Sequence, residues 1–413
     1  MSTLIFDKLK IPGADLNGES SLPPIAGLTN LQQRTKSILD EDDELFIGYG
    51  FVDSPFPYRL QDMYSRELHD MELDCAVLEN EYLRAVFVPS LGGRLWSLFD
   101  KEKDRELTFS NPVFRPANLA FRNAWFSGGV EWNIGIIGHS PFTVDRMFTE
   151  VLTLDDGTPV LRMFEYERIR RLIFRIEAIL PNDSKYLFIR VRIDNTSDQD
   201  TAVYWWSNIA VDEREDVRVL VPADKSYRWG YSRKLTKISI PYVTIQADQL
   251  RGGEGKTGTY HWDISRTTQL PQAMDFFFYI PKEQRKWISA VDGSGYGLIQ
   301  TSTDVLQGRK LFVWGMGAGG RNWQTFLSQP GSAYIEIQAG LARTQLEHLP
   351  MEGNAVISWL EAYGPIKAES DILHGKDWNA AVTEIEKNLE NACPRALVEQ
   401  MHEKVKQELD GRK

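Results

Sequence analysis

The sequence predicts an all-β fold, an antiparallel sandwich or barrel that ends in a short helical tail. At least twelve short runs of β-branched and aromatic residues follow one another within residues 71–365. The spacers between them, such as LPNDS and TSDQD, are too short for the crossover helices of a parallel sheet. A helical period of apolar residues appears near the C-terminal end. Together these observations favour an antiparallel β protein.

The N-terminal residues 1–70 are expected to be an arm and first strands packed on the sandwich. The first 45 residues mix Pro, Gly, Ser and charge, so we expect few regular elements there. LDCAVLEN and EYLRAVFVP then meet at Asn80-Glu81, which indicates a hairpin. Asp156-Gly157 lies between two further strands and is the strongest hairpin signal. The later strand candidates are RRLIFRIEAIL, KYLFIRVRIDN, TAVYWWSNIAV, MDFFFYI, GYGLIQTS, KLFVWGMG, AYIEIQAG and NAVISWLEAYG.

Residues 366–413 are predicted to form a helical tail. Apolar residues recur every four positions in two segments separated by Asn391 and Pro394, which predicts a pair of helices. This pair either caps the sheet or offers a surface for a partner, so a homo-oligomer is one expectation. The apolar positions are Ala381, Ile385 and Leu389 in the first segment, and Leu397, Met401, Val405 and Leu409 in the second.

Composition limits the partners. A net charge of −11 and a pI near 5.2 disfavour nucleic acid and anionic membranes, which need basic patches. The N-terminal residues lack a signal-peptide pattern, and no apolar run is long enough to span a membrane. Cys75 and Cys393 are far apart, so we expect no disulfide framework and a cytoplasmic location. Zinc, calcium and dinucleotide motifs are not found, so no metal or other cofactor is expected.

The segment SGGVEWNIGIIGH, residues 127–139, is the richest in potential chemistry. It combines Glu131, Trp132, Asn133 and His139 with glycines, which favour a loop or bent strand over a helix. Apolar neighbours predict a raised pKa for Glu131, unless it is a structural carboxylate that accepts turn N–H groups. His139 is the best candidate for a proton carrier or hydroxyl ligand, whereas the other histidines are expected to be solvated. Such polar groups beside indoles are typical of a sugar site.

Other candidates come from strand alternation. Glu336 and Gln338 share one face of a strand, either lining a cleft or facing solvent. Arg94 is expected either to bind substrate hydroxyls or to pair with a buried carboxylate, and Arg122 is similar. The glycine run after Trp314 is interpreted as an aromatic-walled loop over a cleft. The remaining candidates for an aromatic and polar wall are Tyr204, Trp206, Asn208 and Glu361.

Several segments together resemble the galactose-mutarotase-like superfamily, whose members share a β-supersandwich. They include LENEYLRAVFVPSLGGRLWSLFDKEKDREL, NPVFRPANLAFRNAWFSGGVEWNIGIIGHS, YWWSNIAV, YIEIQAGLARTQ and ISWLEAYGP. The resemblance is closest to a family within it long known as a domain of unknown function, whose members often carry helical repeats after the sandwich. It implies a glutamate base at Glu336, in the match Glu336-Ile337-Gln338 to a Glu-x-Gln motif, and a histidine at His139.

The sequence departs from mutarotases at one position. Their main catalytic histidine lies four residues before an asparagine, where this chain has Tyr204 before Asn208. A tyrosine with an ordinary pKa near 10 is a poor acid at neutral pH. We therefore predict a glycoside hydrolase for a small sugar or oligosaccharide, with Glu131 as general acid and Glu336 as base or nucleophile. The alternatives are a sugar mutarotase or epimerase and a non-catalytic carbohydrate-binding module.

Overall fold

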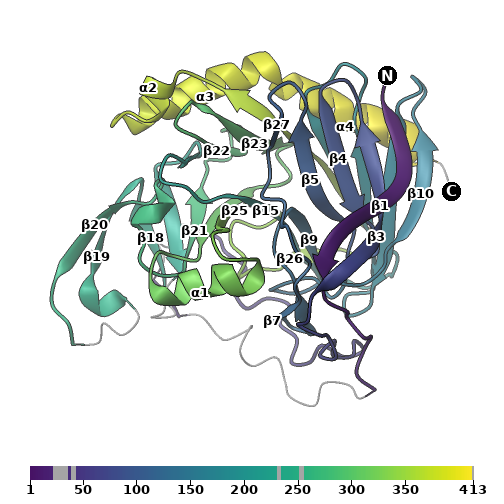
Figure 1. Ribbon diagram of the computed structural model, residues 1–413, viewed down its shortest axis with the longest axis horizontal. Helices are drawn as coiled ribbons and strands as arrows, with labels where there is room; N and C mark the ends of the chain where they lie inside the picture. Colours follow the sequence, from purple (N-terminus) through teal and green to yellow (C-terminus); the bar gives the residue numbers. More distant parts are fainter. Residues whose placement is uncertain (22–35, 39–42, 230–233, 251–254, 412–413) are drawn as a thin grey trace.

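Two large β-sheets pack face to face and form the body of the protein, as Figure 1 shows. The computed structural model describes residues 1–21, 36–38, 43–229, 234–250 and 255–411. Nearly all strand pairs are antiparallel, and β18 with β2 is a parallel pair. The predicted antiparallel β fold is confirmed.

The large sheet is 13-stranded and the small sheet is 8-stranded. The large sheet has the order β1 (Thr3–Gly13), β3 (His69–Glu79), β4 (Leu83–Val88), β5 (Arg94–Asp100), β9 (Val130–Ile134), β15 (Trp205–Asp212), β25 (Tyr334–Gly340), β24 (Gly308–Val313), β21 (Met274–Tyr279), β17 (Lys225–Trp229), β18 (Lys234–Ser239) and β2 (Lys36–Ile38), with β6 (Arg105–Glu106) beside β5. The small sheet has the order β10 (Phe148–Thr153), β11 (Pro159–Glu167), β12 (Leu172–Ile179), β13 (Leu187–Asn195), β27 (Val356–Lys367), β23 (Tyr296–Ser302), β22 (Trp287–Val291) and β16 (Arg218–Leu220).

Short pairs and helices complete the described part of the chain. The pairs are β7 (Ala117–Ala120) with β8 (Asn123–Trp125), β14 (Thr201–Val203) with β26 (Leu349–Met351), and β19 (Tyr242–Gln246) with β20 (Thr259–Asp263). The helices are α1 (Ala318–Leu327), α2 (Ser370–Leu373), α3 (Trp378–Ala392) and α4 (Arg395–Leu409), with short 3₁₀ turns η1 (Ala247–Gln249) and η2 (Thr267–Gln269).

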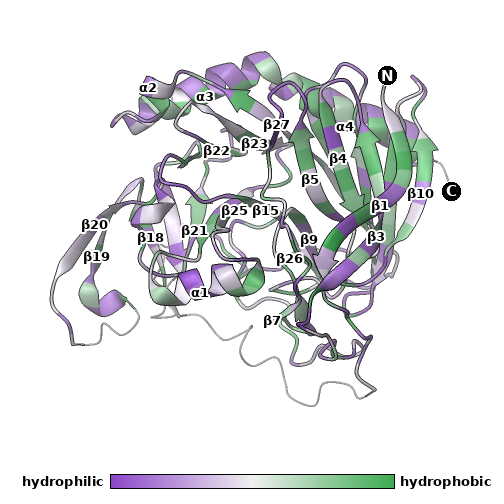
Figure 2. Cartoon of the chain, in the orientation of Figure 1, coloured by the Kyte–Doolittle hydropathy of each residue, from purple (hydrophilic) through white to green (hydrophobic). Residues whose placement is uncertain are grey.

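The main core lies between the two sheets. On β25, alternation places Ile335 and Ile337 in this core, so Glu336 and Gln338 face the opposite side of the large sheet. Trp359 of β27 enters the same core from the small sheet. Figure 2 shows the strands β4 and β5 as mainly apolar and β3 as polar in its first part and apolar in its second, while α3 and α4 alternate between apolar and polar residues. This alternation is the pattern of helices with one buried face.

Helices α3 and α4 lie against β27 of the small sheet, as in Figure 1. The predicted apolar face of α3 is confirmed, because Ala381, Ile385 and Leu389 are buried. In α4 the prediction is confirmed for Val405 and Leu409, and Met401 packs against the core, whereas Leu397 is 38% exposed. The buried residues of α4 are Val398, His402, Val405 and Leu409.

Two of the histidines expected to be solvated are buried, and that expectation is corrected. His402 on α4 lies at hydrogen-bond distance from Ser358 of β27, 3.1 Å. His348 is completely buried, and its Nδ1 donates to the carbonyl oxygen of Tyr49. Polar sequence neighbours suggested solvent, whereas strand and helix packing supply both rings with partners.

The first strands expected within residues 1–70 include β1, which pairs with β3 along its whole length. As an edge strand with mostly exposed residues, β1 alternates between polar and apolar residues only over Lys8–Ile11. One other expectation needs correction. The glycine run after Trp314 leads into helix α1 rather than a loop. Gly320 fits there because a Cβ at this position would lie 2.1 Å from the carbonyl oxygen of Gly315.

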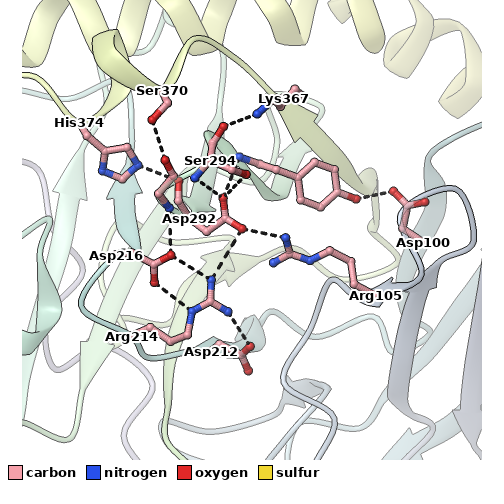
Figure 3. Close-up of polar contacts among 12 residues, drawn as sticks. Asp100, Arg105, Asp212, Arg214, Asp216, Asp292, Ser294, Lys367, Ser370 and His374 are labelled. Carbon is pink, nitrogen blue, oxygen red and sulfur yellow. Dashed lines mark hydrogen bonds and ion pairs between the residues drawn. The ribbon is translucent and has the colours of Figure 1, made fainter.

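An ionic network connects the two sheets at one end of the sandwich (Figure 3). Arg105 of the large sheet donates to Asp292, which follows β22 of the small sheet, at 2.7 Å. Tyr296 of the small sheet donates its hydroxyl to Asp100 of β5. Burial opposes ionisation of Asp292, but hydrogen bonds from Ser294 and Arg105 lower its pKa to about 2. This network fixes how the sheets meet, outside the cleft described below.

Candidate functional site

Neighbouring strands of the large sheet align polar side chains on the face that points away from the core. Glu131 of β9, Asn208 of β15, Gln338 of β25 and Lys310 of β24 are successive cross-strand partners. Directly opposed residues have Cβ atoms about 5 Å apart, so these side chains share one face. Glu336 precedes Gln338 by two residues and lies on the same face. The register thus gathers carboxylates, amides and an ammonium group from four separate segments.

A cleft of about 280 Å³ lies over this polar face. Its size is near the lower end of the range for small-molecule sites, about 300–1,000 Å³, which suits a compact ligand. Its wall contains both polar and aromatic side chains. The lining residues are Leu119, Trp125, Gly138, His139, Asn208, Asp275, Lys310, Phe312, Trp314, Glu336, Gln338 and Gln345.

Glu131 is buried behind the cleft and surrounded by donors. Trp125 Nε1 donates to both carboxylate oxygens at 3.1 Å, and Thr143 donates at 2.7 Å. His139 Nδ1 donates at 2.8 Å, and an Arg94 guanidinium nitrogen lies 3.7 Å away. The weaker amide contact of Asn133 is 3.3 Å long. An ionised carboxylate, which has acceptors only, can accept hydrogen bonds from all of these donors.

The predicted raised pKa of Glu131 is wrong. Burial alone would raise it, but the charges of His139 and Arg94 and the hydrogen bonds from His139 and Thr143 outweigh burial. They lower the pKa of Glu131 to about 2. A carboxyl group that is ionised at neutral pH cannot supply a proton to a leaving group. The structure therefore does not support Glu131 as the general acid.

His139 connects Glu131 to the cleft. Its Nδ1 is bonded to the Glu131 carboxylate, and its ring packs against the indole of Trp125 at a centroid distance of 4.7 Å. Nε2 has no hydrogen-bond partner among the residues that the structure describes. The ring lies after Gly138, whose φ of 109° an L side chain rarely adopts. Its orientation is thus fixed on one side, while the other nitrogen is free for a ligand.

Glu336 is the cleft carboxyl group that resists ionisation. Burial is the largest cause and raises its pKa, with a smaller contribution in the same direction from the Glu131 charge. The charges of His139 and Lys310 and the hydrogen bond from Gln338 oppose this rise. Glu336 is 7% exposed and lines the cleft. Its position agrees with the strand alternation seen in the sequence.

A chain of hydrogen bonds ends on Glu336. Asp275 and Lys310 form an ion pair of 2.6 Å, and Lys310 Nζ donates to Gln345 Oε1 at 2.5 Å. Gln345 Nε2 donates to Gln338 Oε1 at 2.5 Å. Gln338 Nε2 then donates to Glu336 Oε2 at 2.7 Å. We call these five residues the amide chain.

Aromatic rings and an unpaired polar atom form the rest of the cleft. Trp125 and Trp314 supply indoles, and Trp314 stacks on Trp323 of α1 at 5.7 Å. Asn208 Oδ1 is buried and has no hydrogen-bond partner among the described residues, whereas the indole of Trp314 interacts with the hydroxyl group of Tyr334. A buried polar atom without a partner costs about 1–3 kcal/mol. An acceptor beside indoles is therefore available to a ligand that carries hydroxyl groups.

Several predicted substrate contacts lie outside the cleft. Arg94 pairs with Glu131, donates to the carbonyl oxygen of Gly128 and stacks over a phenylalanine ring, which is the buried-carboxylate alternative. Arg122 binds Asp145 and Glu19 and holds the N-terminal region. Their guanidinium groups are 1–3% exposed, so both are structural in this fold.

The indole and amide of the sequence segment also have structural partners. Trp132 faces the core between the sheets, where its Nε1 donates to the carbonyl oxygen of Gly93 at 2.8 Å. Asn133 Oδ1 accepts the backbone N–H of Ser140 at 2.7 Å, which shapes the loop before His139. Neither side chain lines the cleft.

Tyr204, Trp206 and Glu361 are likewise corrected. Burial raises the pKa of Tyr204, which packs on the ring of His348. Trp206 is fully buried against Gly340, where a Cβ would lie 2.2 Å from the indole. Glu361 of β27 points into the core between the two sheets, and the cleft lies on the other side of the large sheet. Its carboxylate accepts hydrogen bonds from four donors. These are Ser207, Trp359, Gln300 and Tyr363.

Sequence reasoning did not select Asp275, Lys310 or Gln345. One signal was present, because Lys310, Phe312 and Trp314 alternate along KLFVWG and therefore share a face. A lysine between aromatic residues on a sheet face is unusual unless an acidic residue pairs with it. That partner, Asp275, comes from a different strand, which the local sequence does not indicate.

Within the described residues, no group of His, Cys, Asp and Glu has the arrangement of a metal site. No helix in the described part of the chain is long and apolar enough to cross a membrane. The cleft brings together the imidazole of His139, the amide chain that ends on Glu336, and two indoles.

The fold is similar to that of several solved structures of low sequence identity. A protein from Klebsiella pneumoniae, proposed to be an aldose 1-epimerase, aligns with a TM-score of 0.51 at 13% identity, over 76% of this chain and 83% of that one. A galactose mutarotase-like protein from Clostridium acetobutylicum aligns with a TM-score of 0.49 at 10% identity, over 71% and 96%. At these identities the likeness concerns the fold.

The family of this chain follows from its sequence. Residues 52–364 match the family described as domain of unknown function DUF5107, and the chain belongs to that family. A TPR-domain containing protein from Parabacteroides distasonis aligns with a TM-score of 0.66 at 18% identity, over 88% of this chain. The alignment covers 55% of that protein, so the chain spans about half the length of this relative.

Proposed function

We propose that the protein acts on a sugar and transfers protons at its anomeric centre, as an aldose 1-epimerase does. The observation that carries this proposal is the placement of Glu336 and His139 in one cleft. Glu336 is a buried carboxyl group with a raised pKa, and His139 is an imidazole with one ring nitrogen free. Such a pair can accept a proton at one point of a small ligand and donate one at another. The sugar-related neighbours of the same fold support this proposal at the level of the fold.

In the proposed reaction, ionised Glu336 removes the proton of the anomeric hydroxyl group. Protonated His139 donates its Nε2 proton to the ring oxygen, and the bond between this oxygen and the anomeric carbon breaks. The aldehyde group that forms turns about its bond to the neighbouring carbon. The reverse transfers then close the ring as the other anomer, so both side chains regain their starting states. The Glu131 carboxylate holds the His139 ring in position and attracts its positive charge.

The cleft has the other groups that a sugar requires. Trp125 and Trp314 offer apolar surfaces for the faces of a ring. Asn208 Oδ1 can accept a hydrogen bond from a hydroxyl group of the ligand. Binding would satisfy an atom that the protein alone leaves unpaired, which favours a ligand with hydroxyl groups.

Polarimetry tests the proposal. Pure anomers of glucose, galactose and other common aldoses should reach equilibrium faster with the protein than in buffer. Glu336→Gln and His139→Asn should each lower this acceleration at least about a hundredfold, the usual size of a general acid or base contribution. Glu72→Gln, a change on the exposed part of β3, is the matched control and should leave the rate unchanged. The proposal fails if no aldose is accelerated, or if both cleft variants keep the wild-type rate.

Glycoside hydrolysis is the second candidate function. It is favoured by two carboxyl groups in the cleft, Glu336 with its raised pKa and Asp275. They lie two strands apart through Phe312, which places their backbones about 10 Å from each other. This pair differs from the predicted one, because Glu131 is ionised and closed off by its donors. Release of the aryl group from aryl glycosides, lost in Glu336→Gln and Asp275→Asn, would favour hydrolysis.

A further inference from the structure

The direction of every hydrogen bond in the amide chain is set by Lys310. An ammonium group has donors and no acceptor, so the atom of Gln345 that it meets must be the carbonyl oxygen. The Gln345 amide nitrogen is then left to face Gln338, whose oxygen accepts it. The Gln338 amide nitrogen in turn faces Glu336 Oε2. One charge therefore orients two amides in succession.

Lys310 is itself held firmly in place. Asp275 pairs with its Nζ at 2.6 Å, and the side chain is 6% exposed. Nζ also lies 5.2 Å from the ring centroid of Phe277 and 5.6 Å from that of Phe312. Lys310 is the cross-strand partner of Gln338, so the sheet fixes the backbone of both. Gln345 bridges them from the loop after β25.

The end of the amide chain distinguishes the two oxygens of Glu336. Oε2 accepts from the Gln338 amide and cannot also carry a proton directed at that donor. Oε1 has no partner among the described residues, and Glu336 lines the cleft. When Glu336 is protonated, its proton belongs on Oε1.

We propose that Lys310 is a positioning residue: its ammonium group, held by Asp275, orients the Gln345 and Gln338 amides so that Glu336 exchanges its proton through Oε1 alone. The orientation belongs to the fold, whereas its use in catalysis rests on the proposed function. Without the charge, each amide can turn over, and a Gln338 oxygen facing Glu336 would stabilise a proton on Oε2 instead. The proton would then be directed away from the cleft.

Infrared difference spectroscopy of a pH titration tests this inference without any sugar. The carboxylic acid carbonyl band of Glu336 is assigned by its loss in Glu336→Gln. The wild type should give one narrow band, because one oxygen carries the proton. Lys310→Met should broaden or split that band and move its titration midpoint upward by about one pH unit, because a nearby positive charge that opposes protonation is gone. Lys310→Arg, which keeps a donating charge, should restore both features in large part.

Two further variants complete the design. Gln345→Leu interrupts the amide chain at a half-buried loop residue and should also split the band, which keeps the test valid if Lys310→Met does not fold. Lys8→Met removes an exposed lysine that pairs with Asp74 on the β1–β3 ribbon, and it should leave the band unchanged. An unchanged band in both Lys310→Met and Gln345→Leu would overturn the inference.

Kinetics separate this inference from the proposed function. If the protein equilibrates anomers, Lys310→Met should lower kcat about tenfold, because the proton is misplaced. An infrared effect without any sugar conversion would support the orientation by Lys310 and contradict the proposed function. Sugar conversion with an unchanged infrared band would contradict the inference and leave the function standing.

Discussion

The most quantitative consequence concerns Glu131, whose replacement by glutamine should change how stability depends on pH. The pKa of this carboxyl group falls from 4.5 to about 2 in the folded protein. A pKa difference of 1 between the folded and unfolded states corresponds to about 1.4 kcal/mol. The ionised group therefore contributes about 3 kcal/mol to the free energy of unfolding. Because the folded pKa is the lower one, this contribution is complete above about pH 5. It disappears as the pH falls towards 2.

Urea unfolding of the wild type and Glu131→Gln between pH 7 and pH 2 measures this difference. The variant should be less stable at pH 7, because its amide nitrogen would face donors from Trp125, His139 and Thr143. The gap between the two proteins should narrow by about 3 kcal/mol as the pH falls from 5 to 2. Glu72→Gln on the exposed ribbon should give a nearly constant gap. A constant gap for Glu131→Gln would show that this carboxylate is not held ionised, and would refute the reasoning.

Other changes probe the rest of the structure. Glu361→Gln should lower the midpoint of thermal unfolding and leave sugar binding unchanged in calorimetry, because its partners lie in the core; weaker binding without unfolding would contradict this placement. Gly340→Ala should destabilise the protein by about 1–3 kcal/mol through contact with Trp206, and a stable variant would show that the indole lies elsewhere. Asp292→Asn should lower the free energy of unfolding at neutral pH and have less effect as the pH approaches 2. The reason is that the lowered pKa of Asp292 lets the carboxylate stabilise the folded protein only while it is ionised. Equal losses of stability at both pH values would argue against the ion pair with Arg105.

The fold was largely predictable because its local signals agree. Alternating apolar residues, the Asp156-Gly157 turn and the helical period of the tail each depend on neighbours in sequence. First strands were expected within residues 1–70, but the bounds of β1 were not predicted, because an edge strand with mostly exposed residues gives a weak apolar signal. Helix α1 was missed because its glycines favour a loop. Close packing at position 320 nevertheless requires a glycine within this helix.

The site was predictable in part, and the limit is geometric. Alternation correctly paired Glu336 with Gln338, and Glu361 was selected by the same kind of signal. A period of two says which residues share a face, but it does not say which face meets the core. Glu336 therefore lines the cleft, while Glu361 lies inside the sandwich.

The charge state of Glu131 shows a second limit. Its sequence neighbours are apolar or glycine, which predicts a raised pKa. In the folded protein burial still opposes ionisation, but the charge of His139, from the same segment, and that of Arg94, from a distant strand, lower the pKa. The direction of a pKa shift depends on which groups the fold brings together, and the sequence alone does not show that His139 and Arg94 both reach Glu131.

The central claim is that Glu336 and His139 transfer protons at the anomeric centre of a sugar bound in this cleft. Proton NMR exchange spectroscopy on an equilibrated aldose measures the interconversion of anomers directly and needs no pure anomer. The account predicts exchange between the two anomeric signals with the wild type, and loss of that exchange in Glu336→Gln and in His139→Asn. Equal exchange in the wild type and both variants, or no exchange for any aldose that the protein binds, would contradict it.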